Sequence, residues 1–232
     1  MRLALFFLTL VCLSGCNSVH PYTVSVNSFS SAKASELQRY YVVPGNPSTT
    51  EDDLQFQEAK FYLEQILQPK GFQPADSLAK ANLAIILTYG MGQPQTYTST
   101  SSVPVYKQTG GGIHPYSQVT YGIYGAQVTS GTIYQQPTYS VVGQETKITS
   151  KTVYSRWARI DAVDMKEARK TNKVTSAWDT RIESSGTSGD LRQIIPVLIA
   201  GAKDYVATST GRNVDVVMTP QQVNARLLSK GQ

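Results

Sequence analysis

The chain has 232 residues and a formal net charge of +5, from 21 Lys and Arg against 16 Asp and Glu. The basic residues are dispersed, and an arm for binding nucleic acid would concentrate them in one block. The sequence also lacks the G-x-x-x-x-G-K pattern of a phosphate-binding loop, which argues against a nucleotide ligand. Composition and charge leave the fold class open, so it is predicted from the order of the secondary-structure elements along the chain.

The first residues have the pattern of a secretory signal. Arg2 is followed by an apolar run over residues 3–11, which is too short to span a bilayer, since a spanning helix needs about 20 apolar residues. The tetrapeptide LSGC at positions 13–16 follows directly. It resembles the lipobox of bacterial lipoproteins. The resemblance implies that residues 1–15 are cleaved and that Cys16 carries a diacylglycerol and an N-acyl lipid.

The residue after the lipobox indicates the membrane. In lipoproteins of this kind an aspartate at this position usually means retention in the inner membrane, and here the residue is Asn17. The resemblance therefore implies the outer membrane of a two-membraned cell, with the protein on its periplasmic face. Cleavage also removes Cys12 and leaves Cys16 alone, so the mature chain has no disulfide and needs a packed core for its stability.

Residues 17–36 are polar and rich in serine. We expect residues 16–36 to form the lipidated end and a flexible tether, followed by a single α/β domain over residues 37–232. The alternative is that Val24 and Val26 begin an edge strand.

Residues 40–89 predict a β-α-β unit. A strand over residues 40–43 precedes a helix, which the capping-box spacing of Ser48 and Glu51 places near those residues. A continuous apolar run over residues 83–89 predicts a strand buried on both faces. The buried face of the helix is predicted to contain Phe56, Ala59, Leu63, Ile66 and Leu67.

Residues 90–140 form an insertion of different composition. This segment has no Asp or Glu, and Lys107 is its one Lys or Arg. Its biased Tyr, Gly, Ser, Thr and Gln content predicts either a disordered loop or an excursion of twisted hairpins. Half of the 14 tyrosines of the chain lie here, namely Tyr97, Tyr106, Tyr116, Tyr121, Tyr124, Tyr134 and Tyr139.

Residues 141–185 predict two long antiparallel strands. Arg156, Ala158 and Ile160 share one face of the first strand and Trp157 lies on the other. We expect Trp157 and Trp178 to face each other across this pair, as core packing or as a platform for sugar rings.

The last part of the chain predicts helix, strand and helix. A helix begins near Ile195, with Pro196 in its first turn, and a strand follows over residues 213–218. Thr219 and the proline after it predict the cap of a short basic helix over residues 220–229. The order is therefore β-α-β-insertion-β-β-α-β-α. It predicts an α/β (α+β) two-layer sandwich with a mixed, mostly antiparallel sheet and helices on one face.

Several of these features resemble a family of bacterial lipoproteins that carry a domain of unknown function. The likeness covers most of residues 40–218, although the insertion is longer here and Asn82 replaces an aspartate. It implies a compact lipoprotein domain without an assigned activity. The residues that carry it are Lys70-Gly71-Phe72, Leu83–Tyr89, Ile160-Asp161, Ala177-Trp178 and Pro196.

The polar residues do not predict a catalytic, cofactor or metal site. His20 lies in the expected tether and His114 in the insertion, where neither has the ordered scaffold of a hydrolase triad. Asp161 and Asp164 flank a strand end and are the one carboxylate pair considered for a cation or for glycoside cleavage. A hydrolase is therefore the least favoured of three functions.

The favoured function is a non-catalytic structural or adaptor domain that contacts an envelope protein. The alternative is a module that binds peptidoglycan or polysaccharide through the insertion. In both cases the candidate binding surface consists of tyrosine side chains, which offer broad amphipathic contact. Its predicted members are Tyr116, Tyr121, Tyr124 and Tyr134.

Overall fold

The computed structural model describes residues 20–228, so the predicted signal and Cys16 lie outside the described residues. The chain divides into two units. The α/β unit contains the described residues up to Gln95 and those from Val153 onward. The hairpin unit contains Thr96–Thr152. Each unit is described by itself.

The strands of the α/β unit form one sheet in the order β3-β2-β4-β6-β7-β1-β8. β2 pairs in parallel with β3 and β4, and the other neighbours are antiparallel. The strands are β1 (Tyr22–Ser30), β2 (Arg39–Pro44), β3 (Gln73–Pro74), β4 (Leu83–Met91), β6 (Gly125–Asp164), β7 (Ser176–Gly186) and β8 (Val214–Met218).

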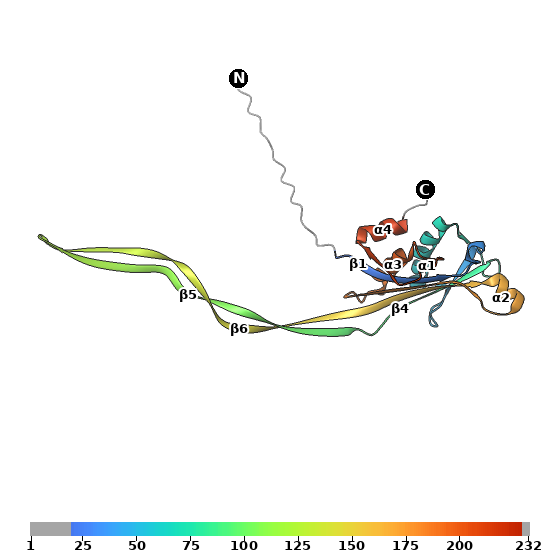
Figure 1. The fold of residues 1–232 in the computed structure, drawn as a ribbon, viewed down its shortest axis with the longest axis horizontal. Helices are drawn as coiled ribbons and strands as arrows, with labels where there is room; N and C mark the ends of the chain where they lie inside the picture. Colours follow the sequence, from blue (N-terminus) through green and yellow to red (C-terminus); the bar gives the residue numbers. More distant parts are fainter. Residues whose placement is uncertain (1–19, 229–232) are drawn as a thin grey trace, which may run out of the picture. The chain divides into compact units, whose positions relative to one another are not determined.

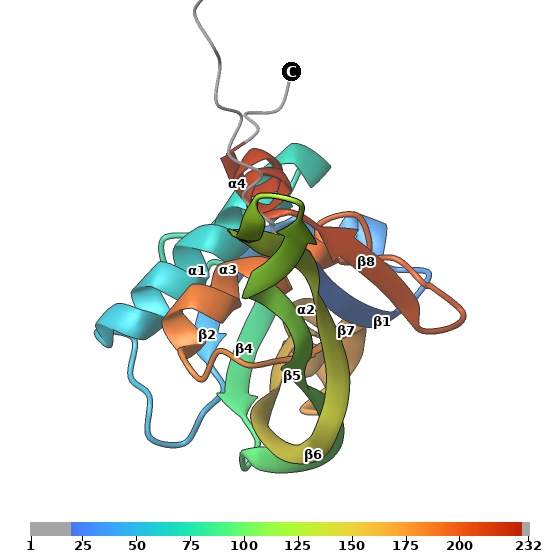
Figure 2. The same cartoon turned by 90° about the vertical axis from the view of Figure 1, so that its left-hand side faces the viewer.

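Three helices, α1, α3 and α4, lie on one face of this sheet, and α2 connects β6 to β7 (Figures 1 and 2). The expected fold class, a mixed and mostly antiparallel sheet with helices, is confirmed at this level. The helical elements are α1 (Leu54–Leu67), α2 (Met165–Thr171), α3 (Leu191–Ala202) and α4 (Pro220–Leu228), with short 3-10 turns η1 (Ala34–Glu36) and η2 (Gln68–Lys70).

The apolar helix faces follow the sequence more closely than the helix caps do. The five residues predicted for the buried face of α1 are all buried. The cap, however, is Asp53 rather than Ser48, because the Asp53 carboxylate accepts the backbone N–H of Phe56 at 3.0 Å. At α4, Thr219 and Gln222 bond each other's backbone N–H groups through their side chains, which is the reciprocal capping arrangement.

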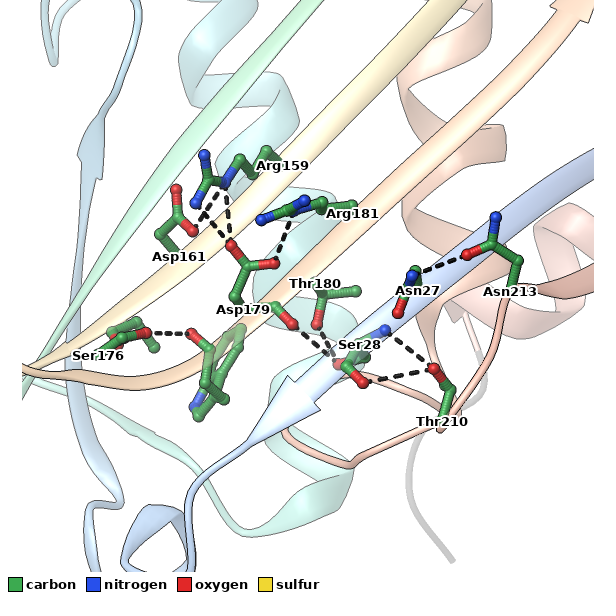
Figure 3. A network of polar contacts seen from close by, with 12 residues as sticks. Asn27, Ser28, Arg159, Asp161, Ser176, Asp179, Thr180, Arg181, Thr210 and Asn213 are labelled. Carbon is green, nitrogen blue, oxygen red and sulfur yellow. Dashed lines mark hydrogen bonds and ion pairs between the residues drawn. The ribbon is translucent and has the colours of Figure 1, made fainter.

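The predicted tether is wrong for residues 22–30, which form β1. This strand pairs with β7 on one side and β8 on the other, so it is not an edge strand either. Val24 and Val26 are fully buried. Ser28 is buried too, and its hydroxyl lies 2.7 Å from that of Thr180 (Figure 3). A serine-rich composition thus concealed the alternation of a strand, because serines can be satisfied inside a sheet.

The helix α3 also differs from its prediction. It begins at Leu191, where the Asp190 side chain accepts the backbone N–H of Arg192, and Pro196 lies inside the helix. Proline has no N–H, so the Arg192 carbonyl loses its helical partner. The burial of eight α3 residues offsets this loss. The observed order differs from the predicted one by adding β1, β3, α2 and β5.

The hairpin unit resolves the alternative left open for the insertion. β5 (Gln95–Gly122) and the first part of β6 form a two-stranded antiparallel hairpin, and not an irregular loop. The unit ends at Thr152 rather than at residue 140. Over residues 20–228, no helix has the length and apolarity that a bilayer crossing requires.

Candidate functional site

The predicted tyrosines all lie on the hairpin unit with exposed side chains. The exposed fractions are 43% for Tyr116, 83% for Tyr121, 102% for Tyr124 and 69% for Tyr134. Tyr121 and Tyr124 lie at or beside the turn that joins β5 to β6. These aromatic rings are therefore available for contact along and at the tip of the hairpin.

The four tyrosines differ in their exposure. Tyr116 is the least exposed because its ring packs against the main chain of Gly131, where an added Cβ would lie 2.8 Å from the ring. The groove beside Trp157, described below, is lined by residues of the α/β unit. The four tyrosines are exposed, and their role in binding stays a prediction.

Hydroxyl and amide side chains bond across the hairpin. Such cross-strand pairs contribute about 0.2–1 kcal/mol each. Either hydroxyl of a Thr or Ser pair can donate, so the chemistry is the same on both strands. The pairs are Thr96–Thr152 at 3.0 Å, Thr98–Ser150 at 3.3 Å, Thr109–Ser140 at 3.0 Å and Ser102–Gln144 at 2.9 Å.

A second candidate surface is the sheet face opposite α1, α3 and α4, here called the open face. Cross-strand pairing of β6 with β7 places Asp161 beside Asp179 and Arg159 beside Arg181. Like charges directly opposite are destabilising. Ion pairs compensate here: Arg159 contacts Asp179 diagonally across the strands at 2.7 Å and Asp161 on its own strand at 2.9 Å (Figure 3). Arg181 contacts Asp179 at 3.2 Å.

The two carboxyl groups differ in acidity. Burial and the hydrogen bond to Asp179 raise the pKa of Asp161 to about 6. Burial acts on Asp179 in the same direction, but the hydrogen bonds from Asp161 and Arg159 outweigh it and lower the pKa of Asp179. Asp161 is therefore the weaker acid of the pair, and it loses its proton as the pH rises through about 6.

We predict that Asp161→Asn flattens part of the pH dependence of stability. The folded-state pKa of Asp161 lies above its unfolded value, so its contribution is fully present below pH ~4 and is lost as the pH rises through about 6. The variant should gain on the order of 1 kcal/mol over the parent at pH 7 and nothing at pH 4. Urea unfolding of both proteins at the two pH values measures this, and an equal difference at both contradicts it.

The carboxylate pair considered from the sequence, Asp161 with Asp164, is not formed. Asp164 is instead the cap of α2, where its carboxylate accepts the N–H groups of Lys166 and Glu167, both at 2.9 Å. The neighbour of Asp161 is Asp179, which the sequence did not single out. Within residues 20–228, the His, Cys, Asp and Glu side chains form no group of three placed to hold a metal ion.

The two tryptophans do not face each other. Trp157 pairs with Glu183 on the open face and is 37% exposed, whereas Trp178 is 1% exposed in the core. The register explains this, since successive side chains of a strand alternate between faces. Trp157 packs over Gly90, where an added Cβ would lie 2.7 Å from the indole.

Trp157 borders a groove of about 430 Å³ on this side of the α/β unit. Its walls combine one aromatic ring with a carboxylate and several hydroxyl groups, which is a set that suits a polar ring-shaped ligand. The lining residues are Thr23, Ser25, Ser155, Arg156, Trp157, Glu183, Ser184 and Ser185.

Comparisons with known proteins do not show a family. No family model matches the chain, and no curated protein matches it. A PDZ domain protein from Parabacteroides distasonis ATCC 8503 is similar in structure at 15% identity with a TM-score of 0.37. The match covers 84% of this chain and 38% of that one. A PelC variant from Paraburkholderia phytofirmans, solved as a dodecamer, is similar at 7% identity and a TM-score of 0.35, over 79% of this chain and 95% of that one.

Proposed function

We propose that the chain is a lipid-anchored, non-catalytic lipoprotein on the periplasmic face of the outer membrane. It acts as a structural or adaptor domain that contacts an envelope macromolecule through the hairpin unit. The observation that carries this proposal is the exposure of the hairpin side chains, including the four predicted tyrosines.

The physical argument compares the two units. The α/β unit buries most of its apolar side chains in one core, whereas the valines, isoleucines and tyrosines of the hairpin unit are exposed. An isolated two-stranded hairpin is at best marginally stable in water. Extended exposed apolar surface on a soluble protein usually marks an interaction site. The hairpin unit is therefore the part of the chain that gains most from a partner.

The anchor rests on the LSGC sequence and is tested at Cys16. We expect Cys16→Ser to move the protein from the membrane fraction to the soluble fraction and to abolish labelling with a radioactive fatty acid. Thiol acylation supplies the attachment, and several acyl chains on one residue make it lasting. Retention of the variant in membranes, or an intact leader in the mature parent by mass spectrometry, would overturn the anchor.

The contact role is tested by shortening the hairpin. Thr96 and Thr152 are hydrogen-bonded neighbours across the two strands. An Asn-Gly turn can therefore replace residues 97–151, because this dipeptide favours two-residue hairpin turns. We expect the shortened protein to keep the melting temperature of the α/β unit within a few degrees and to lose its chemical crosslinks in cells.

A matched variant tests the side chains alone. It keeps the full hairpin and replaces Tyr116, Tyr121, Tyr124 and Tyr134 by serine. Loss of crosslinks in this variant too assigns the contact to the tyrosines. Unchanged crosslinking in both variants would overturn the contact role.

A second candidate function is binding of peptidoglycan or polysaccharide, and the groove beside Trp157 favours it. An exposed indole stacks on sugar rings, and the surrounding hydroxyls and Glu183 offer hydrogen bonds. We expect Trp157→Ala to reduce co-sedimentation with insoluble peptidoglycan at least tenfold if the groove binds glycan. Loss in the shortened hairpin but not in Trp157→Ala would assign glycan binding to the tyrosines instead.

A further inference from the structure

We infer that the partner of the hairpin unit is a second copy of this chain, whose own hairpin pairs along the open edges of β5 and β6. The inference rests on the proposed function, because it names the partner of the same surface. Four features of the described residues support it: the edges, their sparse protection, the side-chain chemistry and the charge.

The hairpin has two long unpaired edges. Within the part of the chain that the structure describes, β5 pairs only with β6. The pairs of β6 with β4 and β7 begin at Arg156 and Tyr154. Along most of the hairpin, both outer edges therefore present backbone N–H and C=O groups that can pair with a further strand.

The other sheet edges of the chain are short, whereas the hairpin edges carry a few prolines and charges spread over a much greater length. The sheet of the α/β unit ends in β3, which has two residues, and in β8, which has five and includes Asp215. Short strands and edge charges are the usual defences against pairing with another molecule. β5, by contrast, has 28 residues and one full charge, at Lys107. This contrast indicates that the hairpin edges are kept available.

A copy of the same chain fits both edges at once. Placing β5 of one copy beside β6 of the next repeats the antiparallel pairing that already exists inside each hairpin. The hydroxyl pairs inside one hairpin show that these side chains complement each other across strands. A single foreign strand would cover one edge only. Repetition of a head-to-tail contact closes into a ring or continues as a filament.

Charge does not oppose association of identical copies. The hairpin unit contains Lys107, Glu145, Lys147 and Lys151, and its remaining residues carry no full charge. Like charges weaken self-association, so a near-neutral surface suits a partner with the same surface. A strongly charged foreign partner would find little to complement here.

Three prolines limit where the edges pair. Pro104, Pro115 and Pro137 each lack a backbone N–H, and proline is tolerated in strands mainly at edges. Pairing between copies is therefore expected over the segments between them, such as residues 105–110 of β5, which end before the positive-φ glycines Gly111 and Gly112.

The test uses the full lipoprotein, with its anchor, in mild detergent. Light scattering and native mass spectrometry should show oligomers of this chain alone. Two variants then probe the edges at Val105 on β5 and Val141 on β6, which are 40% and 53% exposed. One carries lysine at both positions and the other carries glutamate at both. Edges of identical copies then carry charge of the same sign, whereas edges in a mixture carry opposite charges.

We expect each charged variant alone to self-associate at least tenfold more weakly than the parent, and a 1:1 mixture to recover mixed oligomers. Unchanged melting of the α/β unit serves as the folding control. A monomeric parent that crosslinks in cells to a protein of different mass overturns this inference but leaves the proposed contact role intact. A monomeric parent whose crosslinks do not depend on the hairpin overturns both.

Discussion

Val26→Asp should destabilise the α/β unit by about 3–5 kcal/mol, which is a large part of the stability of an ordinary domain. Val26 is fully buried and lies between Ile182 of β7 and Val214 of β8 in the sheet. A carboxylate at this position has no cationic partner and must either stay charged in an apolar core or take up a proton. Urea unfolding followed by far-UV circular dichroism measures the loss.

Thr23→Asp is the matched control on the same strand. Thr23 is exposed and its side chain points to the opposite face from that of Val26. We expect this variant to change the stability by less than about 0.5 kcal/mol. Equal and small effects of both substitutions would mean that residues 22–30 behave as the tether predicted from composition, and not as β1.

Local signals allowed α1, α3, α4 and the central strands to be predicted, but not α2. The five apolar residues of α1 at helical spacing, the run of β4 and the alternation around Ile160 depend on neighbours within a few residues. Helix starts were less accurate. Ser48 has capping-box spacing, but the cap is Asp53, because several acceptors near one another compete for the same role.

Long-range pairing explains what the sequence did not predict. β1 forms because β7 and β8 lie on either side of it, and both are more than 140 residues away in the chain. The partner of Trp157 depends on the register between β6 and β7, which placed Glu183 rather than Trp178 opposite. The pairing of Asp161 with Asp179 depends on the same register. The candidate tyrosines were predicted from composition alone. For the segment that contains them, the sequence left open a disordered loop or twisted hairpins.

The two units divide the physical tasks of the chain. Apolar residues of the α/β unit pack against one another, so this unit supplies stability. The hairpin unit has hydroxyl pairs and exposed apolar side chains but lacks a second layer in the described residues. Substitutions in the α/β unit should therefore change the free energy of unfolding. Substitutions in the hairpin unit should change the proposed binding to a partner. The two tryptophans allow a direct test of the stability side.

Trp178→Ala should destabilise the protein by about 3–5 kcal/mol, the range for truncating a buried large aromatic residue. Trp178 is 1% exposed, and its ring meets that of Phe72 edge to face at a centroid distance of 6.3 Å. Phe72 in turn contacts Tyr40, so the truncation leaves a cavity beside a three-ring cluster. Urea unfolding at pH 7 measures the loss.

Two further variants separate volume from polarity. The buried indole N–H of Trp178 has no hydrogen-bond partner among the described residues. Trp178→Phe removes this donor and keeps one ring, so we expect a smaller loss, about 1–2 kcal/mol. Trp157→Ala should change the stability by less than about 1 kcal/mol, because that ring is partly solvated.

The same variants provide their own spectroscopic check, since the chain has two tryptophans and each single variant leaves one. Trp157→Ala should retain the blue-shifted emission of a buried indole, and Trp178→Ala should retain the red-shifted emission of a solvated one. Similar emission maxima in the two variants, or similar losses of stability, would mean that β6 and β7 pair in a different register. Such a result would also remove the open-face groove beside Trp157, because the groove depends on the same register.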